Sequence, residues 1–420
     1  MIKPYTTIKK CRSCNKKISK KDFLFSIGKM AITGIFLKKK EKPKYKIPLD
    51  LYMCGDCKLV QLLNSTNPNL MFRDYWYESG INQTMTDHLN SVVSYVNNFK
   101  KFDNPKVLDI GANDGTLMEK FSQITKKKNI VGIDPAKKIF KKKGYKFVND
   151  FFSKSILNKN KISNKFDIIT SVAMFYDLEN PNSFADDIKN SLSEKGVWFL
   201  ELNYLGSLMK DYILDTIAHE HVCYYSLTTL KRILDRNSLF INKVDFSTIN
   251  GGSIRLIISK KKKNVKEIKK ILNKEKRDGL NDFKKMKTLI SRIKIIRDKL
   301  KKFILIQNKK KKKIAILGAS TRGNTIMQFC NLNYKNFIGA SDRNKNKDGL
   351  YMNGTLVKIY SEQVIRDKKP EYFFVLPYFY IKELIKREIN LLKSGVKFIV
   401  PLPYPYLIHF KNGKITKKII

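Results

Sequence analysis

The sequence predicts an α/β protein with two Rossmann-like units and a cysteine-bearing N-terminal arm. An apolar strand at 107–110 runs into a glycine-rich turn at 111–115, and a helix follows it. A second apolar strand, 314–317, enters another glycine-containing turn at 318–324. Strand and helix patterns alternate from about 99 to 260, which is typical of a parallel sheet that binds ligands at the carboxyl ends of its strands.

The first glycine-rich turn has the properties of a nucleotide-binding loop. Glycines let backbone N–H groups approach a ligand, and the N-terminus of the following helix, 116–121, favours a negative group. About 20 residues later, strand 130–133 ends in Asp134, which is placed to accept ribose hydroxyls. The loop is not G-x-G-x-x-G, which weakens an NAD interpretation. It resembles motif I of class I S-adenosylmethionine (SAM) methyltransferases, with the pattern carried by Asp109, Gly111, Asn113 and Gly115.

The length and composition indicate a globular protein of two or three domains. Of the 420 residues 42% are hydrophobic, with 26 Phe and 20 Tyr, which is ample for buried cores. The formal net charge of +47 has two interpretations: nucleic-acid binding through counterion release, or the Lys enrichment of an AT-rich coding sequence. Because Lys is spread over the whole length, we favour the second and expect no nucleic-acid partner. The charge would still attract an anionic substrate.

Neither an export signal nor a membrane span is predicted. The N-terminus is polar and lacks the apolar region of a signal peptide. The longest apolar stretch, 23–37, is interrupted by Lys29 and is shorter than the roughly 18 residues that a span needs. We therefore expect a cytoplasmic protein, and no pattern indicates its oligomeric state.

Two C-x-x-C pairs predict a metal site in the N-terminal arm. In a chain without export signals such cysteines are metal ligands rather than disulfides. Four thiolates close a tetrahedral shell with no open position, so we expect structural Zn²⁺; the alternative is four unrelated buried thiols. The predicted ligands are Cys11, Cys14, Cys54 and Cys57.

Two further stretches contain side chains that could bind a ligand or transfer a proton. Aromatic side chains followed by polar ones at 75–85 suit a lid over a ligand, or an aromatic anchor between arm and core. Two of the four His flank a Glu in His219-Glu220-His221. His221 is a proton acceptor near neutral pH, and Glu220 can orient a neighbour or act as the base. The same stretch could instead form a zinc site, which the spacing disfavours, or a polar turn that caps a helix.

In their order along the chain, these motifs resemble the nucleotide-sugar C-methyltransferase family, bacterial SAM-dependent enzymes that act on keto-deoxysugars. The resemblance covers nearly the whole chain and rests on both C-x-x-C pairs, 48–52, 75–85, 109–115, 219–221, 250–255 and 318–324. It implies a zinc-binding N-terminal domain, a class I SAM methyltransferase core and a Rossmann-like C-terminal domain. We place these at 1–98, 99–260 and 314–420. The Lys-rich segment 261–313 has the apolar spacing of two amphipathic linker helices.

The motifs and the resemblance together give three groups of candidate site residues. The catalytic candidates are Glu220, His221, Tyr77 and Tyr75, the last two for the developing oxyanion. The cofactor candidates are Asp109, Gly111, Asn113, Gly115, Asp134, Asp150 and Phe151. The substrate candidates are His219, Asn250, Gly252, Ser253, Arg255, Ser320 and Arg322. The turn at 250–255 suits a phosphate or a hairpin bend, and the turn at 318–324 suits an anion cradle or an inherited fold that only packs.

Two positions depart from the family pattern. Ala218 stands where members carry a Tyr before H-E-H, and 174–177 lacks the His found there in the family. Those side chains would have helped proton transfer and enolate stabilisation. The resemblance still favours C-methylation of a small nucleotide-linked keto-deoxysugar through a general base and an enolate, but the two departures leave the methylated atom undecided. O-methylation of a sugar, methylation of RNA, and a zinc-stabilised binding role without activity stay open.

Overall fold

The computed structural model describes residues 3–137, 140, 142–162, 165–263 and 265–420. The chain forms two compact units. Unit 1 contains Met1–Leu24, Leu51–Ser207 and Glu220–Phe283, and unit 2 contains Phe25–Asp50, Leu208–His219 and Lys284–Ile420. Each unit is therefore assembled from segments that are far apart in the sequence.

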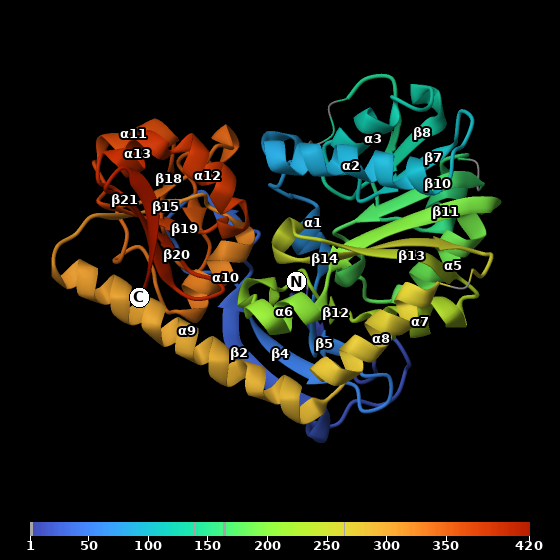
Figure 1. The fold of residues 1–420 in the computed structure, drawn as a ribbon, viewed down its shortest axis with the longest axis horizontal. Helices are drawn as coiled ribbons and strands as arrows, with labels where there is room; N and C mark the ends of the chain where they lie inside the picture. Colours follow the sequence, from blue (N-terminus) through green and yellow to red (C-terminus); the bar gives the residue numbers. More distant parts are fainter. Residues whose placement is uncertain (1–2, 138–139, 141, 163–164, 264) are drawn as a thin grey trace. The chain divides into compact units, whose positions relative to one another are not determined.

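Unit 1 is built on a seven-stranded sheet in the order β13-β14-β11-β10-β7-β8-β9 (Figure 1). Strands β7 to β11 run parallel to one another. Strand β14 pairs antiparallel with β11, and β13 pairs antiparallel with β14. The strand order reverses between β7 and β10, and ligands bind at such switch points. The strands are β7 (Val107–Ile110), β8 (Ile130–Ile133), β9 (Lys146–Val148), β10 (Phe166–Val172), β11 (Leu192–Asn203), β13 (Phe240–Ser247) and β14 (Ser253–Ser259).

Helices complete the core of unit 1, and their ends follow local capping signals. The side chain of Asn82 accepts a hydrogen bond from the backbone N of Met85 at 2.9 Å and starts α2. Ser226 caps α7 in the same way through the backbone N of Thr229 at 3.2 Å. The helices are α2 (Gln83–Phe99), α3 (Thr116–Phe121), α4 (Lys154–Lys159), α5 (Pro181–Ser191), α7 (Leu227–Arg236) and α8 (Lys266–Asp278), with short 3₁₀ turns η3 (Lys127–Asn129), η4 (Phe175–Asp177) and η6 (Ile249–Gly251).

The arm of unit 1 consists of short strands and turns. Strand β1 (Tyr5–Thr7) pairs with β6 (Asn64–Thr66), and β5 (Val60–Leu62) pairs with the end of β4 (Lys46–Met53) and with β12 (Cys223–Tyr224). The pairing of β12 with β5 attaches the arm to the segment that follows Glu220 and His221. The other short elements are η1 (Lys20–Asp22), α1 (Pro68–Phe72) and η2 (Ser79–Ile81).

Unit 2 is built on a second seven-stranded sheet, in the order β18-β16-β15-β19-β20-β21-β22, whose first five strands are parallel (Figure 1). Its strands are β15 (Ile314–Leu317), β16 (Ala340–Ser341), β18 (Ile359–Tyr360), β19 (Tyr372–Val375), β20 (Lys397–Val400), β21 (Tyr406–Lys411) and β22 (Lys414–Ile419). Its helices are α9 (Phe283–Lys309), α10 (Thr321–Phe329), α11 (Glu362–Asp367), α12 (Ile381–Arg387) and α13 (Ile389–Lys393).

Segments from the first half of the chain also belong to unit 2. Strand β3 (Phe36–Leu37) pairs with β17 (Tyr351–Met352), and β2 (Phe23–Ala31) lies next to β4. The connections η5 (Leu214–Thr216), η7 (Lys345–Lys347) and η8 (Tyr378–Tyr380) are 3₁₀ turns, and α6 (Leu205–Asp211) passes from unit 1 into unit 2.

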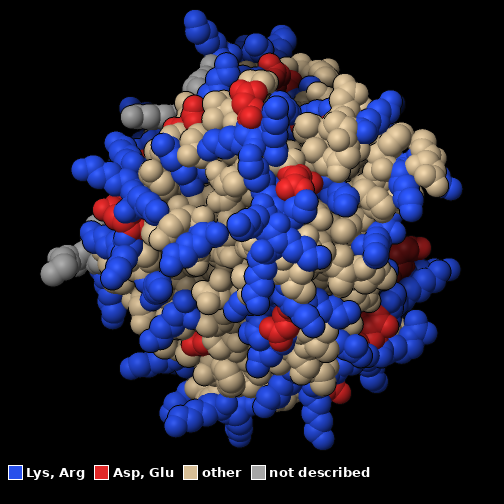
Figure 2. Space-filling view, turned by 90° about the vertical axis from the view of Figure 1, so that its left-hand side faces the viewer, with Lys and Arg blue, Asp and Glu red and all other residues tan. Residues whose placement is uncertain are grey.

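The expected fold class is confirmed: two Rossmann-like sheets and an N-terminal cysteine cluster are present. The predicted linker helices correspond to α8 and α9. Within the described ranges, none of the helices combines the length and the apolar character that crossing a bilayer requires. Figure 2 shows Lys and Arg distributed over one whole face, with few Asp and Glu among them.

Candidate active site and metal centre

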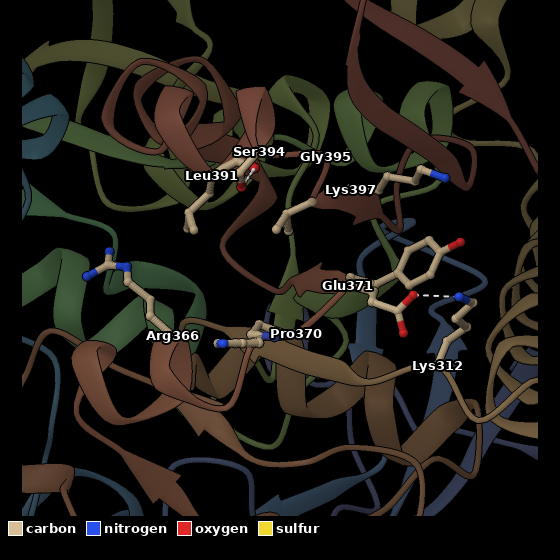
Figure 3. A pocket seen from close by; sticks show the side chains of 11 residues that line it. Lys312, Arg366, Pro370, Glu371, Leu391, Ser394, Gly395 and Lys397 are labelled. Atoms are coloured by element: carbon tan, nitrogen blue, oxygen red, sulfur yellow. Dashed lines mark hydrogen bonds and ion pairs between the residues drawn. The ribbon is translucent and has the colours of Figure 1, made fainter.

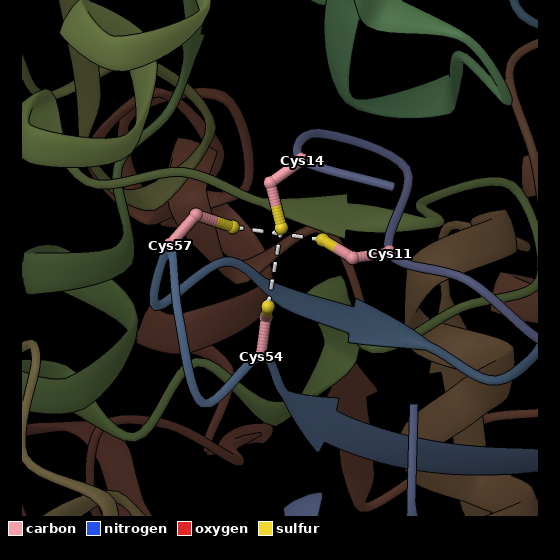
Figure 4. Close-up of side chains that lie close together, drawn as sticks. All are labelled: Cys11, Cys14, Cys54 and Cys57. Atoms are coloured by element: carbon pink, nitrogen blue, oxygen red, sulfur yellow. Dashed lines mark hydrogen bonds between the residues drawn. The ribbon is translucent and has the colours of Figure 1, made fainter. Parts of the chain in front are cut away.

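The four cysteines of the two C-x-x-C pairs come together in unit 1 (Figure 4). Their Sγ atoms all lie within 4.8 Å of one another. The Cys11–Cys57 and Cys14–Cys54 Sγ–Sγ distances are both 3.5 Å. Zn–S bonds of about 2.3 Å in a tetrahedron require sulfur atoms about 3.8 Å apart. The cluster therefore fits a closed structural zinc shell with no position for a substrate.

Neighbouring side chains support this cluster. Nε2 of Gln61 donates a hydrogen bond to Sγ of Cys11 at 3.2 Å, as outer partners of metal ligands do. Arg12 is 5% exposed, and its guanidinium donates to O of Leu62 at 2.6 Å and to Oε2 of Glu179 at 3.1 Å. The first cysteine pair is thus tied to β5 and to the loop before α5.

The glycine-rich turn lies at the carboxyl end of β7. Gly111 (φ 75°) and Gly115 (φ 81°) adopt the left-handed conformation that favours glycine. A Cβ atom at Gly111 would also lie 3.1 Å from Cγ of Met174. Asp109 is 2% exposed and accepts a hydrogen bond from Oγ1 of Thr170 at 2.7 Å, but burial raises the pKa of its carboxyl to about 7.

Two more predicted cofactor carboxylates lie at the ends of the next strands. Asp134 accepts hydrogen bonds from two backbone N–H groups, one of them that of Asn113 at 2.9 Å, and burial raises its pKa. Asp150 accepts from Nη2 of Arg73 at 3.0 Å and from the backbone N of Phe151 at 2.9 Å. The Arg73 guanidinium lies 5.0 Å from the centroid of the Phe151 ring. The predicted cofactor residues therefore lie at or just after the carboxyl ends of three adjacent parallel strands.

The aromatic segment is fastened to the glycine-rich turn. Oδ1 of Asn113 accepts hydrogen bonds from N and Oγ of Ser79 at 3.0 and 3.3 Å, and its Nδ2 donates to O of Tyr77 at 2.8 Å. The backbone N of Gly80 donates to Oδ2 of Asp114 at 2.7 Å. These bonds hold the segment against the turn, which is the placement that a lid requires.

The predicted catalytic residues gather beside this segment with two residues of η4. The ring centroids of Tyr176 and His221 are 4.3 Å apart at an interplanar angle of 61°. Burial raises the pKa of the Tyr75 hydroxyl well above its usual range, and the nearby Glu220 and Asp177 raise it further. Burial likewise raises the pKa of Asp177, and Glu220 adds to it. The cluster consists of Tyr75, Tyr77, Tyr176, Asp177, Glu220 and His221.

The predicted substrate residues of unit 1 occupy the bend of the β13–β14 hairpin and the strand after it. Asn250 and Gly252 have positive φ values of 53° and 119°. Oγ of Ser253 donates to O of Ile249 at 3.2 Å. Nη2 of Arg255 pairs with Oδ2 of Asp245 at 3.0 Å. Of the two roles expected for this turn, the hairpin bend is the one that the fold displays.

The remaining substrate candidates lie in unit 2. His219 is 1% exposed, its Nε2 lies 3.3 Å from O of Ile47, and burial lowers its pKa to about 4. Oγ of Ser320 caps α10 by accepting from the backbone N of Gly323 at 3.0 Å. Nε of Arg322 pairs with Oδ2 of the buried Asp215 at 3.2 Å. Each of these side chains therefore has a structural bond within its own unit.

A separate hollow of about 410 Å³ opens in unit 2 beside the amino ends of β19 and β20 (Figure 3). Lys312 and Arg366 line it, but Lys312 pairs with Glu371 at 2.6 Å and Arg366 with Glu388 at 3.0 Å. The turn at 318–324 follows the carboxyl end of β15. The hollow therefore does not belong to the predicted anion cradle.

Three family models match the chain one after another. They describe a zinc-binding domain over residues 11–72, a methyltransferase domain over 83–240 and a C-methyltransferase C-terminal domain over 248–403. The C-methyltransferase NovU of Streptomyces niveus is 25% identical over 371 residues, which is 86% of this chain and 87% of that relative. The chain belongs to the C-methyltransferase family. This C-methyltransferase depends on SAM, and its cysteine cluster is the metal centre of its zinc-binding N-terminal region.

Solved methyltransferases resemble part of the chain. A SAM-dependent methyltransferase from Clostridium acetobutylicum is 16% identical with a TM-score of 0.32 and covers 41% of this chain and 89% of its own. Magnesium protoporphyrin IX methyltransferase from Synechocystis, with bound S-adenosylhomocysteine, is 14% identical with a TM-score of 0.33 and covers 43% of this chain and 88% of its own.

Sequence reasoning missed several residues of this C-methyltransferase that contact the predicted site. Arg73 belongs to no motif, and Asp114 lies in the 109–115 motif but was given no role; only the fold brings them to Asp150 and Gly80. The segment of Tyr176 and Asp177 entered the sequence analysis through its missing His, and neither residue was assigned a role. Their position directly after strand 166–172 was the signal that could have identified them, since parallel strands place such residues at the ligand-binding edge.

Proposed function

We propose that this C-methyltransferase methylates a carbon next to the ketone of a nucleotide-linked deoxysugar. The observation that carries this proposal is the cluster around Glu220 and His221, which shares unit 1 with the glycine-rich turn. A C–H group beside a ketone is a weak acid, so its removal needs a base in contact and stabilisation of the oxyanion that forms. The cluster offers both kinds of group.

In the proposed mechanism Glu220 and His221 remove the α-proton, and the ring of Tyr176 keeps the imidazole of His221 oriented. Tyr75 or Tyr77 donates a hydrogen bond to the developing oxyanion. Bound SAM supplies an electrophilic methyl group, and Asp134 and Asp150 would hold its adenosyl part. The Asn113 bonds to Tyr77 and Ser79 keep the aromatic segment beside the cofactor turn. Holding two reactants in attack geometry contributes roughly 7–11 kcal/mol of barrier reduction.

The substrate class is supported by the resemblance of the ordered motifs to nucleotide-sugar C-methyltransferases and by the charge of +47, which attracts a diphosphate. His219, Asn250, Gly252, Ser253, Arg255, Ser320 and Arg322 remain its proposed contacts. Arg255 and Arg322 already pair with Asp245 and Asp215. Each would bind a phosphate only by sharing or giving up that ion pair.

The test is turnover of SAM with a panel of nucleotide 4-keto-6-deoxysugars, monitored by formation of S-adenosylhomocysteine and of a methylated sugar. We expect Glu220→Gln and His221→Ala each to lower kcat by roughly 10²–10⁴-fold, the contribution of a general base. Glu194→Gln and His409→Ala are the matched controls; Glu194 is 79% exposed and pairs with Lys260. Full activity in either cluster variant would remove that residue from the mechanism.

A further inference from the structure

Asp177 carries a carboxyl group near the predicted base Glu220. The mechanism above gives this carboxyl group no role. Asp177 ends η4, which begins three residues after β10. Its backbone N donates to O of Met174 at 3.0 Å, which fixes the 3₁₀ turn. In the described part of the chain, its buried Oδ1 has no hydrogen-bond partner. A buried carboxyl oxygen without a partner is costly, so such an atom calls for an explanation.

The surroundings of Asp177 keep a proton on it. Burial raises the pKa of Asp177, and the nearby Glu220 raises it further; both carboxyl groups in turn raise the pKa of Tyr75. Two carboxylates that share a poorly solvated site do not both ionise, so one of them holds a proton at neutral pH. The other titratable groups of the cluster are Tyr77, Tyr176 and His221.

We propose that Asp177 is a catalytic residue that acts as a neutral carboxylic acid and donates a hydrogen bond to the ketone oxygen of the acceptor. This inference rests on the proposed function, because it needs a ketone whose oxygen becomes negative. It also accounts for the segment 174–177, in which the family's His is absent: an acid at Asp177 supplies the donor.

The step balances without an additional reactant. Glu220 or His221 takes the α-proton, and the electron pair of that C–H bond becomes the carbon–carbon double bond of the enolate. Charge moves to the ketone oxygen, where the Asp177 proton is shared but not lost. The new carbon–methyl bond then forms as the sulfur–methyl bond breaks, the pair stays on sulfur, and the carbonyl is restored. The enzyme keeps the α-proton until it passes to solvent.

The variants Asp177→Asn and Asp177→Ala test this role, with Asp235→Asn as the matched control; Asp235 is exposed and pairs with Lys231 on α7. Steady-state kinetics with a nucleotide 4-keto-6-deoxysugar would be measured across pH. We expect Asp177→Ala to lower kcat by about 10²–10³-fold, the effect of losing one oxyanion donor, with little change in KM for SAM. Asp177→Asn keeps a neutral donor, so we expect a smaller loss.

The pH profile separates catalysis from a structural role. Because the acid must keep its proton, kcat of the wild type falls as pH rises through the raised pKa of Asp177. An amide does not titrate, so this alkaline limb should be absent in Asp177→Asn and present in Asp235→Asn. An unchanged limb in Asp177→Asn would overturn the proposal even if Asp177→Ala failed to fold.

Exchange of the acceptor α-proton in D₂O, with S-adenosylhomocysteine in place of SAM, measures enolate formation alone. We expect this exchange to slow with kcat in Asp177→Ala, and normal exchange there would contradict the role. If the wild type methylates the sugar and the Asp177 variants match it, only this inference fails. If the wild type methylates no keto-sugar of the panel, the proposed function fails and this role fails with it.

Discussion

Replacing Glu275 by Ala should cost about 3–5 kcal/mol of unfolding free energy, because it leaves buried backbone N–H groups and hydroxyls without their acceptor. Glu275 on α8 is fully buried. Its carboxylate accepts hydrogen bonds from the backbone N of Leu227 at 2.6 Å, from N and Oγ1 of Thr228 at 2.9 and 2.6 Å, and from the Tyr204 hydroxyl at 2.8 Å. The two backbone donors belong to the first turn of α7, directly after the segment that carries Glu220 and His221.

The expected loss of unfolding free energy follows from the donors that Glu275→Ala leaves without an acceptor. Each backbone N–H that loses its acceptor in the interior costs about 1–3 kcal/mol, and a negative charge at a helix N-terminus adds up to about 2 kcal/mol. The two hydroxyls can rotate toward other acceptors and contribute less. Glu275→Gln should cost less than Ala, because the amide keeps one acceptor oxygen but turns its NH₂ group toward donors.

Urea unfolding followed by circular dichroism measures these differences. Glu267→Ala is the control, since Glu267 lies on the same helix but is exposed, and it should change the unfolding free energy by less than about 1 kcal/mol. An equal effect of Glu275→Ala and Glu267→Ala would refute the view that this carboxylate anchors the start of α7.

Three further predictions concern the metal centre, the aromatic segment and the cofactor site. Chelation of zinc, or the substitution Cys54→Ser, should release the metal and lower the melting temperature of the protein. Atomic emission measures the bound metal, and the control Cys330→Ser should keep it. Metal retained in Cys54→Ser would exclude this cysteine as a ligand. Asn113→Ala should lower kcat by about tenfold by releasing Tyr77 and Ser79, and unchanged kinetics would show that these bonds do not position the segment. The Asp109 pKa of about 7 means that this carboxyl is protonated in acid. Since the cationic amino group of S-adenosylhomocysteine favours the carboxylate, calorimetry should show affinity falling by up to about tenfold per pH unit below 7, and Asp109→Asn should abolish this slope.

Local pattern was enough to predict the elements that carry the cofactor turn. Strands 107–110 and 130–133 and helix 116–121 coincide with β7, β8 and α3, because apolar runs interrupted by glycine specify such units locally. The cysteine pairs were predictable for a similar reason, since their spacing alone fixes a bidentate grip on a metal. The second strand of the C-terminal unit is harder to delimit from pattern, because β16 contains only Ala340–Ser341.

Contacts between segments that are distant in the sequence could not be predicted from sequence pattern. Arg322 was predicted to contact phosphate, but its partner Asp215 is 107 positions away and no spacing rule connects them. Asp114 follows Asn113 in the motif, yet its bond to Gly80 depends on how the segment 75–81 returns to the turn. The assignment of 25–50 to unit 2 also depends on long-range strand pairing, such as β3 with β17.

The most direct test of the central claim is the NMR spectrum of the product made from ¹³C-methyl SAM and a ¹³C-labelled nucleotide keto-deoxysugar. Transfer to a carbon beside the ketone predicts a new methyl signal split by one-bond coupling to a single ring carbon. A methyl signal without that coupling would place the group on oxygen and contradict the enolate mechanism built on Glu220 and His221.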